Sequence, residues 1–127
     1  MFIDYTATRE LVGSGADEID TDAGQIDRSQ KRFGSESVSL SGVGREYQLD
    51  RLEFTWTVTT IPVPVTDLPR WREFAASVAN GETFSFDPYG SKASPDNVLT
   101  VSLVDGSYQE NRFSSTYMQI SFAAIER

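Results

Sequence analysis

The chain has 127 residues, with no cysteine, no histidine, and 19 acidic against 11 basic residues for a net charge of −8. The absence of cysteine excludes disulfides and thiolate chemistry, and the absence of histidine removes the commonest general base and metal ligand. The acidic balance argues against a surface that binds nucleic acid by neutralising phosphates, and no apolar run is long enough to cross a membrane. The length predicts a single domain, 1–127.

The N-terminal part of the chain has a weak pattern. Its first five residues are apolar enough for a short strand or a docking arm. Residues 13–36 are poor in apolar side chains, with Ile19 and Ile26 as their aliphatic residues. This composition is typical of an extended loop or arm that orders against a neighbouring subunit. We therefore place the regular core, a β-sandwich with a helix, at 38–127.

The strongest strand signal covers residues 45–60. Apolar side chains alternate there with polar ones, at Leu52, Phe54, Trp56 and Val58. Tyr47 and Leu49 are in the opposite phase, which predicts a β-bulge near Asp50–Arg51 because a shift of one residue changes the face. The two prolines in 61–65 exclude a central strand, so this segment is expected to be an edge or a crossover.

A short helix is predicted at about 67–80. Apolar residues recur there at spacings of three and four: Leu68, Trp71, Phe74, Ala75 and Val78. Thr66 or Asp67 can cap its start, and Gly81 can end it in a left-handed conformation. Its solvent side is expected to carry Arg70, Arg72 and Glu73.

Further strands are predicted after the helix. Phe84 and Phe86 alternate with polar residues, and apolar and polar residues also alternate within 99–103 and 118–124. Asp105–Gly106 predicts a hairpin turn. The sum is a mainly β fold, an antiparallel β-sandwich or barrel with one short α-helix.

One acidic run could hold a hard cation. Its carboxylates fall at or near alternate positions: Asp17, Glu18, Asp20 and Asp22. An EF-hand loop counted from Glu18 would need glycine and glutamate where Ala23 and Ser29 stand. We therefore favour a solvated acidic loop and assign no metal.

Other candidate sites are equally weak. Gly13–Ser14–Gly15 lacks the strand-and-helix frame of a phosphate loop. Neither Lys31 nor Lys92 stands in the Ser-x-x-Lys frame that a serine nucleophile without histidine would need. The basic cluster Arg28, Lys31 and Arg32 is better explained by salt links between subunits or by solvation than by nucleic acid. We expect no catalytic residue and no cofactor, and hence no enzyme.

The aromatic residues leave one binding hypothesis open. Trp56 and Trp71 occupy core-facing positions of periodic elements, so burial is favoured over sugar stacking. A carbohydrate-binding module would instead expose tyrosines in a groove, with candidates at Tyr89, Tyr108 and Tyr117.

The central unit resembles a known family. A strand, LEFTWTVTT, followed by PRWREFAASVANGETFSFDPYG, is similar to the small tail proteins of long-tailed bacteriophages. In that family a helix ending in F-x-x-x-x-x-x-G precedes a strand x-F-x-F-D-P. The matching residues here are Phe74, Gly81, Phe84, Phe86, Asp87 and Pro88. As an order of elements the resemblance covers residues 38–127.

Within this family the chain looks most like the minor tail or distal tail proteins, including the lambda-type minor tail protein M. The resemblance implies a tail-tube-like fold and a virion protein assembled in the host cytoplasm. It implies a homo-oligomeric ring, six copies, joining the tail tube protein to the tail tip hub proteins. DNA would pass through the channel without specific binding, which suits a net charge of −8.

Alternatives remain at this point. A tail tube protein, a tail terminator protein or a carbohydrate-binding β-sandwich would each fit the same strands. Acids that could face a channel are Glu53, Asp105 and Glu110.

Overall fold

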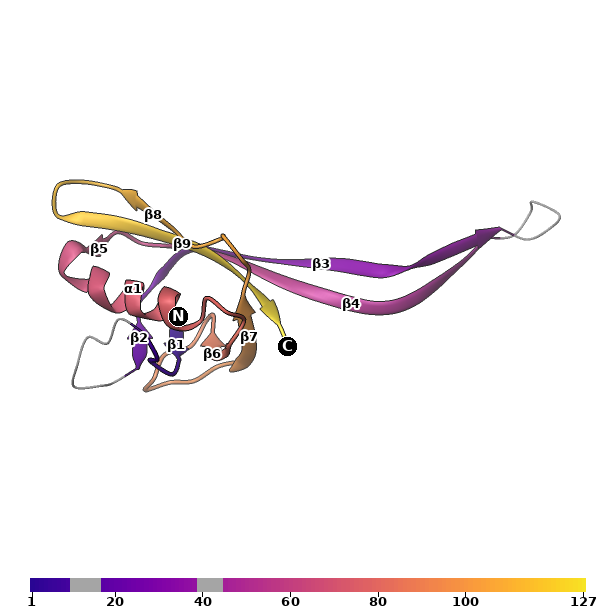
Figure 1. The fold of residues 1–127 in the computed structure, drawn as a ribbon, viewed down its shortest axis with the longest axis horizontal. Helices are drawn as coiled ribbons and strands as arrows, with labels where there is room; N and C mark the ends of the chain where they lie inside the picture. The colour runs from indigo at the N-terminus through magenta and orange to yellow at the C-terminus, as the bar shows by residue number, and fades with distance from the viewer. Residues whose placement is uncertain (10–16, 39–44) are drawn as a thin grey trace.

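A computed structural model describes residues 1–9, 17–38 and 45–127 of the chain. The described part is mainly β, with nine strands, one α-helix and one 3₁₀ turn (Figure 1). In chain order these are β1 (Phe2–Asp4), β2 (Glu18–Asp20), β3 (Ala23–Val38), β4 (Arg45–Thr60), β5 (Val63–Pro64), η1 (Val65–Asp67), α1 (Leu68–Ser77), β6 (Thr83–Asp87), β7 (Leu99–Leu103), β8 (Gln109–Arg112) and β9 (Tyr117–Glu126).

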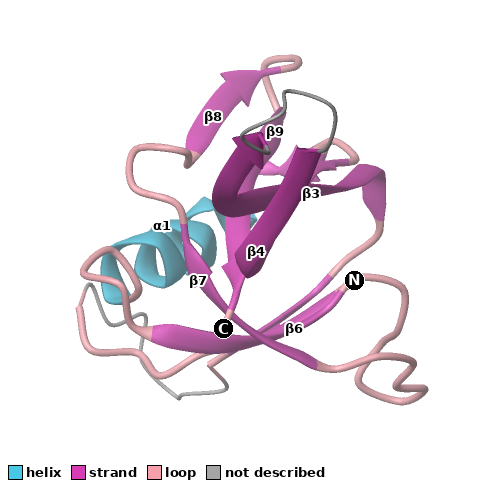
Figure 2. Ribbon diagram, turned by 90° about the vertical axis from the view of Figure 1, so that its right-hand side faces the viewer, coloured by secondary structure: helices cyan, strands magenta, loops and turns pink. Residues whose placement is uncertain are grey.

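The strands form one antiparallel sheet in the order β2-β1-β6-β7-β9-β4-β3, and β5 and β8 also pair with β9. Strand β9 is central because β4 and β5 pair along one of its edges, whereas β7 and β8 pair along the other. In Figure 1, β5, β8 and β9 lie above α1, and β1, β2 and β6 lie below it. In Figure 2 the direction of β6 differs strongly from that of β4, so the sheet is strongly twisted between these strands. The predicted fold class, mainly β with one short helix, is confirmed.

Aromatic rings fill the space between α1 and the sheet. Phe74 is fully buried, and its ring centroid lies 4.9 Å from that of Phe84 and 5.8 Å from that of Phe122. Trp56 and Trp71 are buried in the same cluster, which confirms their predicted core positions. Burying each such side chain contributes roughly 1.5–3 kcal/mol, so this cluster dominates the stability of the fold.

The N-terminal region differs from its prediction. Within the predicted extended loop or arm at 13–36, residues 18–20 and 23–36 form β2 and most of β3. The core also extends beyond 38–127, since Ile3, Tyr5 and Ile19 are buried in it. The sequence of β3 lacks the apolar alternation that predicts a strand, because its side chains from 27 to 32 are all exposed. Its backbone hydrogen bonds with β4 do not require such a pattern. Residues 13–16 lie outside the described residues.

Two register shifts interrupt the β3–β4 ladder. Phe33 pairs with Arg51 and Gly34 pairs with Leu49, so Asp50 is the extra residue of a bulge. This confirms the bulge predicted near Asp50–Arg51. The second shift leaves Gly24 unpaired, where a β-carbon would lie 3.3 Å from the carbonyl oxygen of Thr60.

The helix is confirmed, but it begins differently from its prediction. Asp67 stands at the N-cap position and makes no capping hydrogen bond through its side chain within the described residues. Its φ and ψ of −88° and −8° continue the 3₁₀ turn, whereas a capping residue is normally extended. Gly81 has the predicted left-handed conformation, with a φ of +84°, but α1 ends earlier than predicted, at Ser77, with Val78 at the C-cap position. At ten residues α1 is too short to cross a bilayer, and the described part of the chain contains no longer helix.

Candidate functional site: the projecting arm

The most conspicuous feature of the molecule is a two-stranded arm. Strand β4 pairs with β9 from Thr59 back to Thr55, and beyond Thr55 the β3–β4 hairpin continues alone. We define the arm as residues 30–38 and 45–54, which project from the body in Figure 1. Nine residues at about 3.3 Å each give a length of about 30 Å. Among the described strands β3 pairs only with β4, which makes β3 an edge strand of the sheet.

Apolar side chains continue from the core onto the arm. Leu52, Phe54 and Trp56 share one face of β4, because side chains alternate along a strand. Trp56 is buried in the body, whereas Leu52 is 42% exposed. An exposed leucine on a two-stranded ribbon has little of its own chain to pack against, so this face is available to a partner.

An ion pair ties the root of the arm to the body. The Arg28 guanidinium donates from Nε to Oε1 and from Nη2 to Oε2 of Glu126, both at 3.2 Å. Trp56 Nε1 donates to Glu126 Oε1 at 2.8 Å. Burial opposes ionisation of Glu126, but the hydrogen bonds from Arg28 and Trp56 outweigh it and lower the pKa of this carboxyl group.

The three basic residues near the arm do not form one cluster. In the β3–β4 ladder Arg28 pairs with Trp56 and Arg32 pairs with Leu52, so both arginines lie on the same face of the sheet as Trp56. Lys31 lies on the other face. The Lys31 ammonium is 4.9 Å from the ring centroid of Phe33. Arg28 makes its salt link within the chain, so the expected link between subunits or plain solvation does not describe this residue.

The acidic run is divided between two partners, Ala7 for Asp17 and Lys92 for Glu18 and Asp20. Glu18 pairs with Lys92 Nζ at 2.8 Å, and Asp17 accepts a hydrogen bond from the backbone N–H of Ala7 at 3.1 Å. Within residues 1–9, 17–38 and 45–127, no group of three or more acidic side chains is arranged to hold a metal ion. Among the candidate channel acids, Glu53 lies on the arm, Asp105 follows β7 and borders the same depression as Arg72, and Glu110 in β8 pairs with Arg72 at 2.9 Å.

A buried carboxylate organises the loop after β6. Asp87 is 1% exposed and accepts hydrogen bonds from the backbone N–H groups of Gly90 at 2.9 Å, Asp96 at 2.9 Å and Asn97 at 3.2 Å. Burial alone would raise its pKa, but these hydrogen bonds lower it. A β-carbon at Gly90 would collide with the same carboxylate, so the loop needs glycine there. The sequence places Asp87 in the x-F-x-F-D-P motif but does not predict its burial or its bonds to the loop.

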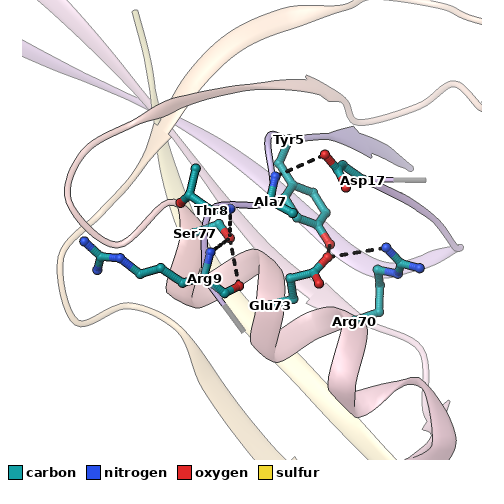
Figure 3. A network of polar contacts seen from close by, with 8 residues as sticks. All are labelled: Tyr5, Ala7, Thr8, Arg9, Asp17, Arg70, Glu73 and Ser77. Atoms are coloured by element: carbon teal, nitrogen blue, oxygen red, sulfur yellow. Dashed lines mark hydrogen bonds and ion pairs between the residues drawn. The ribbon is translucent and has the colours of Figure 1, made fainter. Parts of the chain in front are cut away.

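A second buried carboxylate holds the N-terminal segment against the helix (Figure 3). Glu73 was expected on the solvent side of α1, but its side chain is 2% exposed. The hydroxyl of Tyr5 donates to Glu73 Oε1 at 2.7 Å, and Arg70 Nη1 lies 3.4 Å from the same oxygen. The expectation was wrong because the chain after β1 covers this face of α1. There Ser77 Oγ accepts hydrogen bonds from the backbone N–H groups of Thr8 and Arg9.

The tyrosines proposed for sugar binding do not line one groove. Tyr108 borders a depression of about 440 Å³ beside α1, and its hydroxyl is buried without a partner among the described residues. Tyr89 contacts Trp56 edge-on at 6.0 Å near the arm. Tyr117 is the first residue of β9, and Ala124, which pairs with Trp56, lies seven residues further along the strand. Tyr117 is therefore about 23 Å along β9 from the site where Tyr89 meets Trp56.

The chain matches no family model and no curated protein.

Proposed function

We propose that the chain is a structural subunit that assembles into a ring, as an adaptor of a bacteriophage tail. In this proposal six copies join the tail tube to the tail tip hub and surround a channel for DNA, and the chain has no catalytic role. The observation that carries the proposal is the arm of about 30 Å, which leaves the body and pairs with no other strand of the described residues.

A neighbouring subunit would stabilise such an arm. An isolated two-stranded ribbon is marginally stable in water, and an open strand edge readily pairs or packs with another chain. A ring requires two different surfaces on each subunit, and the arm supplies one while the body supplies the other. The exposed Leu52 would become buried at this contact.

The distribution of charge supports the same assignment. Residues 23–60 contain five basic and five acidic residues, so the remaining six basic and fourteen acidic residues carry the whole net charge of −8. The neutral hairpin can approach the acidic body of a neighbour without the repulsion that two acidic bodies would experience. An acidic body also disfavours adhesion of DNA passing through the channel.

Particle mass in solution tests the proposal. Six copies of 14.1 kDa should give a particle of about 85 kDa by native mass spectrometry. Leu52→Asp should remove this species, because it places a charge in the contact made by the arm. Val98→Asp is the matched control, since Val98 is also an exposed aliphatic residue and lies in the loop held by Asp87.

Negative-stain images then separate the alternatives. An adaptor should stop at single rings, whereas a tail tube protein should form long stacks. A chain that stays monomeric at every concentration, or one in which Leu52→Asp and Val98→Asp assemble equally well, would contradict the proposal that the arm builds a ring.

A further inference from the structure

The sheet changes character where the arm leaves the body. The β4–β9 ladder ends at the pair Thr55–Ile125, so Phe54 and Glu126 are the next residues along the two strands. On this face of the sheet the apolar pair Trp56–Ala124 is therefore followed by Phe54 and the carboxylate of Glu126. The charged group of Glu126 therefore lies directly after the apolar core surface, where the β4–β9 ladder ends and the arm begins.

The side chain of Arg28 crosses β4 at this point. Arg28 belongs to β3 and Glu126 to β9, which lie on opposite sides of β4 in the sheet. The guanidinium carbon lies 3.8 Å from the ring centroid of Phe54 and 5.7 Å from that of Trp56. Both ends of the guanidinium fork reach Glu126, and Trp56 Nε1 donates to the same carboxylate. One connected group thus links three strands across one face.

We propose that this group, Arg28–Glu126 laid across Phe54 and Trp56, is a clamp that sets the angle at which the arm leaves the body. A two-stranded ribbon bends easily where its neighbouring strand ends, because only the β3–β4 ladder continues. A bidentate tie over an aromatic ring fixes the separation of β3 and β9 on one face and removes that freedom. The clamp needs only the fold, whereas its use in assembly rests on the proposed function.

The clamp acts on orientation more than on the stability of the whole fold. Arg28 is 44% exposed and Glu126 is 20% exposed, and ion pairs this accessible contribute little to the free energy of unfolding. An arm already held at its binding angle loses less conformational freedom when a neighbour docks. The body contains a similar pair, Arg72–Glu110, which links α1 to β8 away from the arm and serves as a control.

Spin-label distances in the isolated chain test the clamp. Because the chain has no cysteine, Lys31→Cys on the hairpin and Thr83→Cys on β6 provide two unique labelling sites, both exposed. Double electron–electron resonance on labelled protein diluted into unlabelled protein reports distances within one chain. We expect one narrow distance distribution in the parent and a distribution at least twice as wide in Glu126→Gln and in Arg28→Gln. Glu110→Gln should leave the width unchanged.

Two results would overturn the clamp. One is a Glu126→Gln distribution as narrow as that of the parent, and the other is equal broadening in Glu110→Gln. Unfolding curves of the three variants verify that each is folded before its distances are compared. The spin-label measurement reports distances within one chain, so it tests the clamp separately from the ring. If the ring proposal is wrong, the particle mass shows it. If the clamp proposal is wrong, the width of the distance distribution shows it.

Discussion

Glu73 and Asp87 are both buried carboxylates: Glu73 accepts a hydrogen bond from Tyr5, 68 positions away, and Asp87 accepts hydrogen bonds from the loop that follows it. A buried charge without partners would cost several kcal/mol, so such groups are retained only where donors surround them. Glu73 joins the N-terminal segment to α1, and Asp87 joins the two ends of the loop that presents Tyr89. Their role is therefore to position segments of the chain.

Removing the hydroxyl of Tyr5 tests the first of these links. Tyr5→Phe should lower the free energy of unfolding by about 1–2 kcal/mol, because Glu73 loses a buried donor. Urea denaturation should show a lower midpoint with an unchanged slope. Tyr89→Phe removes a hydroxyl from a side chain that is 66% exposed and should change stability by less than about 0.5 kcal/mol. Equal effects of the two substitutions would refute the link.

The pH dependence of stability tests Asp87. Its pKa in the folded chain is below the ordinary value of 3.8, so its ionised form stabilises the fold. This contribution is complete above the unfolded pKa and is lost as the pH falls through the folded pKa. Asp87→Asn should be less stable than the parent by about 1–3 kcal/mol at pH 6, and the difference should shrink at pH 3. A difference that stays constant between these pH values would be inconsistent with this role.

At the scale of elements, α1 and β6 are joined by aromatic packing. Phe84 on β6 is buried and meets Phe74 of α1 almost at right angles. Phe84→Ala should cost about 3–5 kcal/mol, because it removes a buried ring and leaves a cavity. Phe113→Ala, in the exposed turn after β8, should cost less than about 0.5 kcal/mol in the same chemical denaturation experiment. A loss below about 1 kcal/mol at Phe84 would disprove its place in the core.

Strand β3 illustrates a different way of forming an element. It has few apolar side chains and is stabilised by its ladder with β4, which is interrupted only at the two bulges. The bulge at Asp50 was predictable because the apolar phase of β4 changes there. The partner strand was not predictable, because backbone hydrogen bonds leave no periodic mark on exposed residues.

At the scale of the whole molecule, the body and the arm are suited to different tasks. The body contains the aromatic core and all of the net charge, whereas the arm of residues 30–38 and 45–54 is neutral, with four basic and four acidic residues. The proposed ring uses this division, since a neutral arm docks on an acidic neighbour. The Leu52→Asp and Val98→Asp pair tests this division at the same scale, because both substitutions add one negative charge and only the first lies on the arm.

The sequence by itself determined the mainly β fold, the position of the helix, the left-handed conformation of Gly81, the bulge at Asp50 and the burial of Trp56 and Phe84. These features follow from local periodicity and backbone preference, which neighbouring residues specify. Only the tertiary structure decided that β3 is a strand and that the candidate site is an arm with the Arg28–Glu126 ion pair at its root. The Tyr5–Glu73 and Arg28–Glu126 contacts join residues 68 and 98 positions apart. Such pairs depend on how the sheet brings distant strands together, and no local pattern encodes that arrangement.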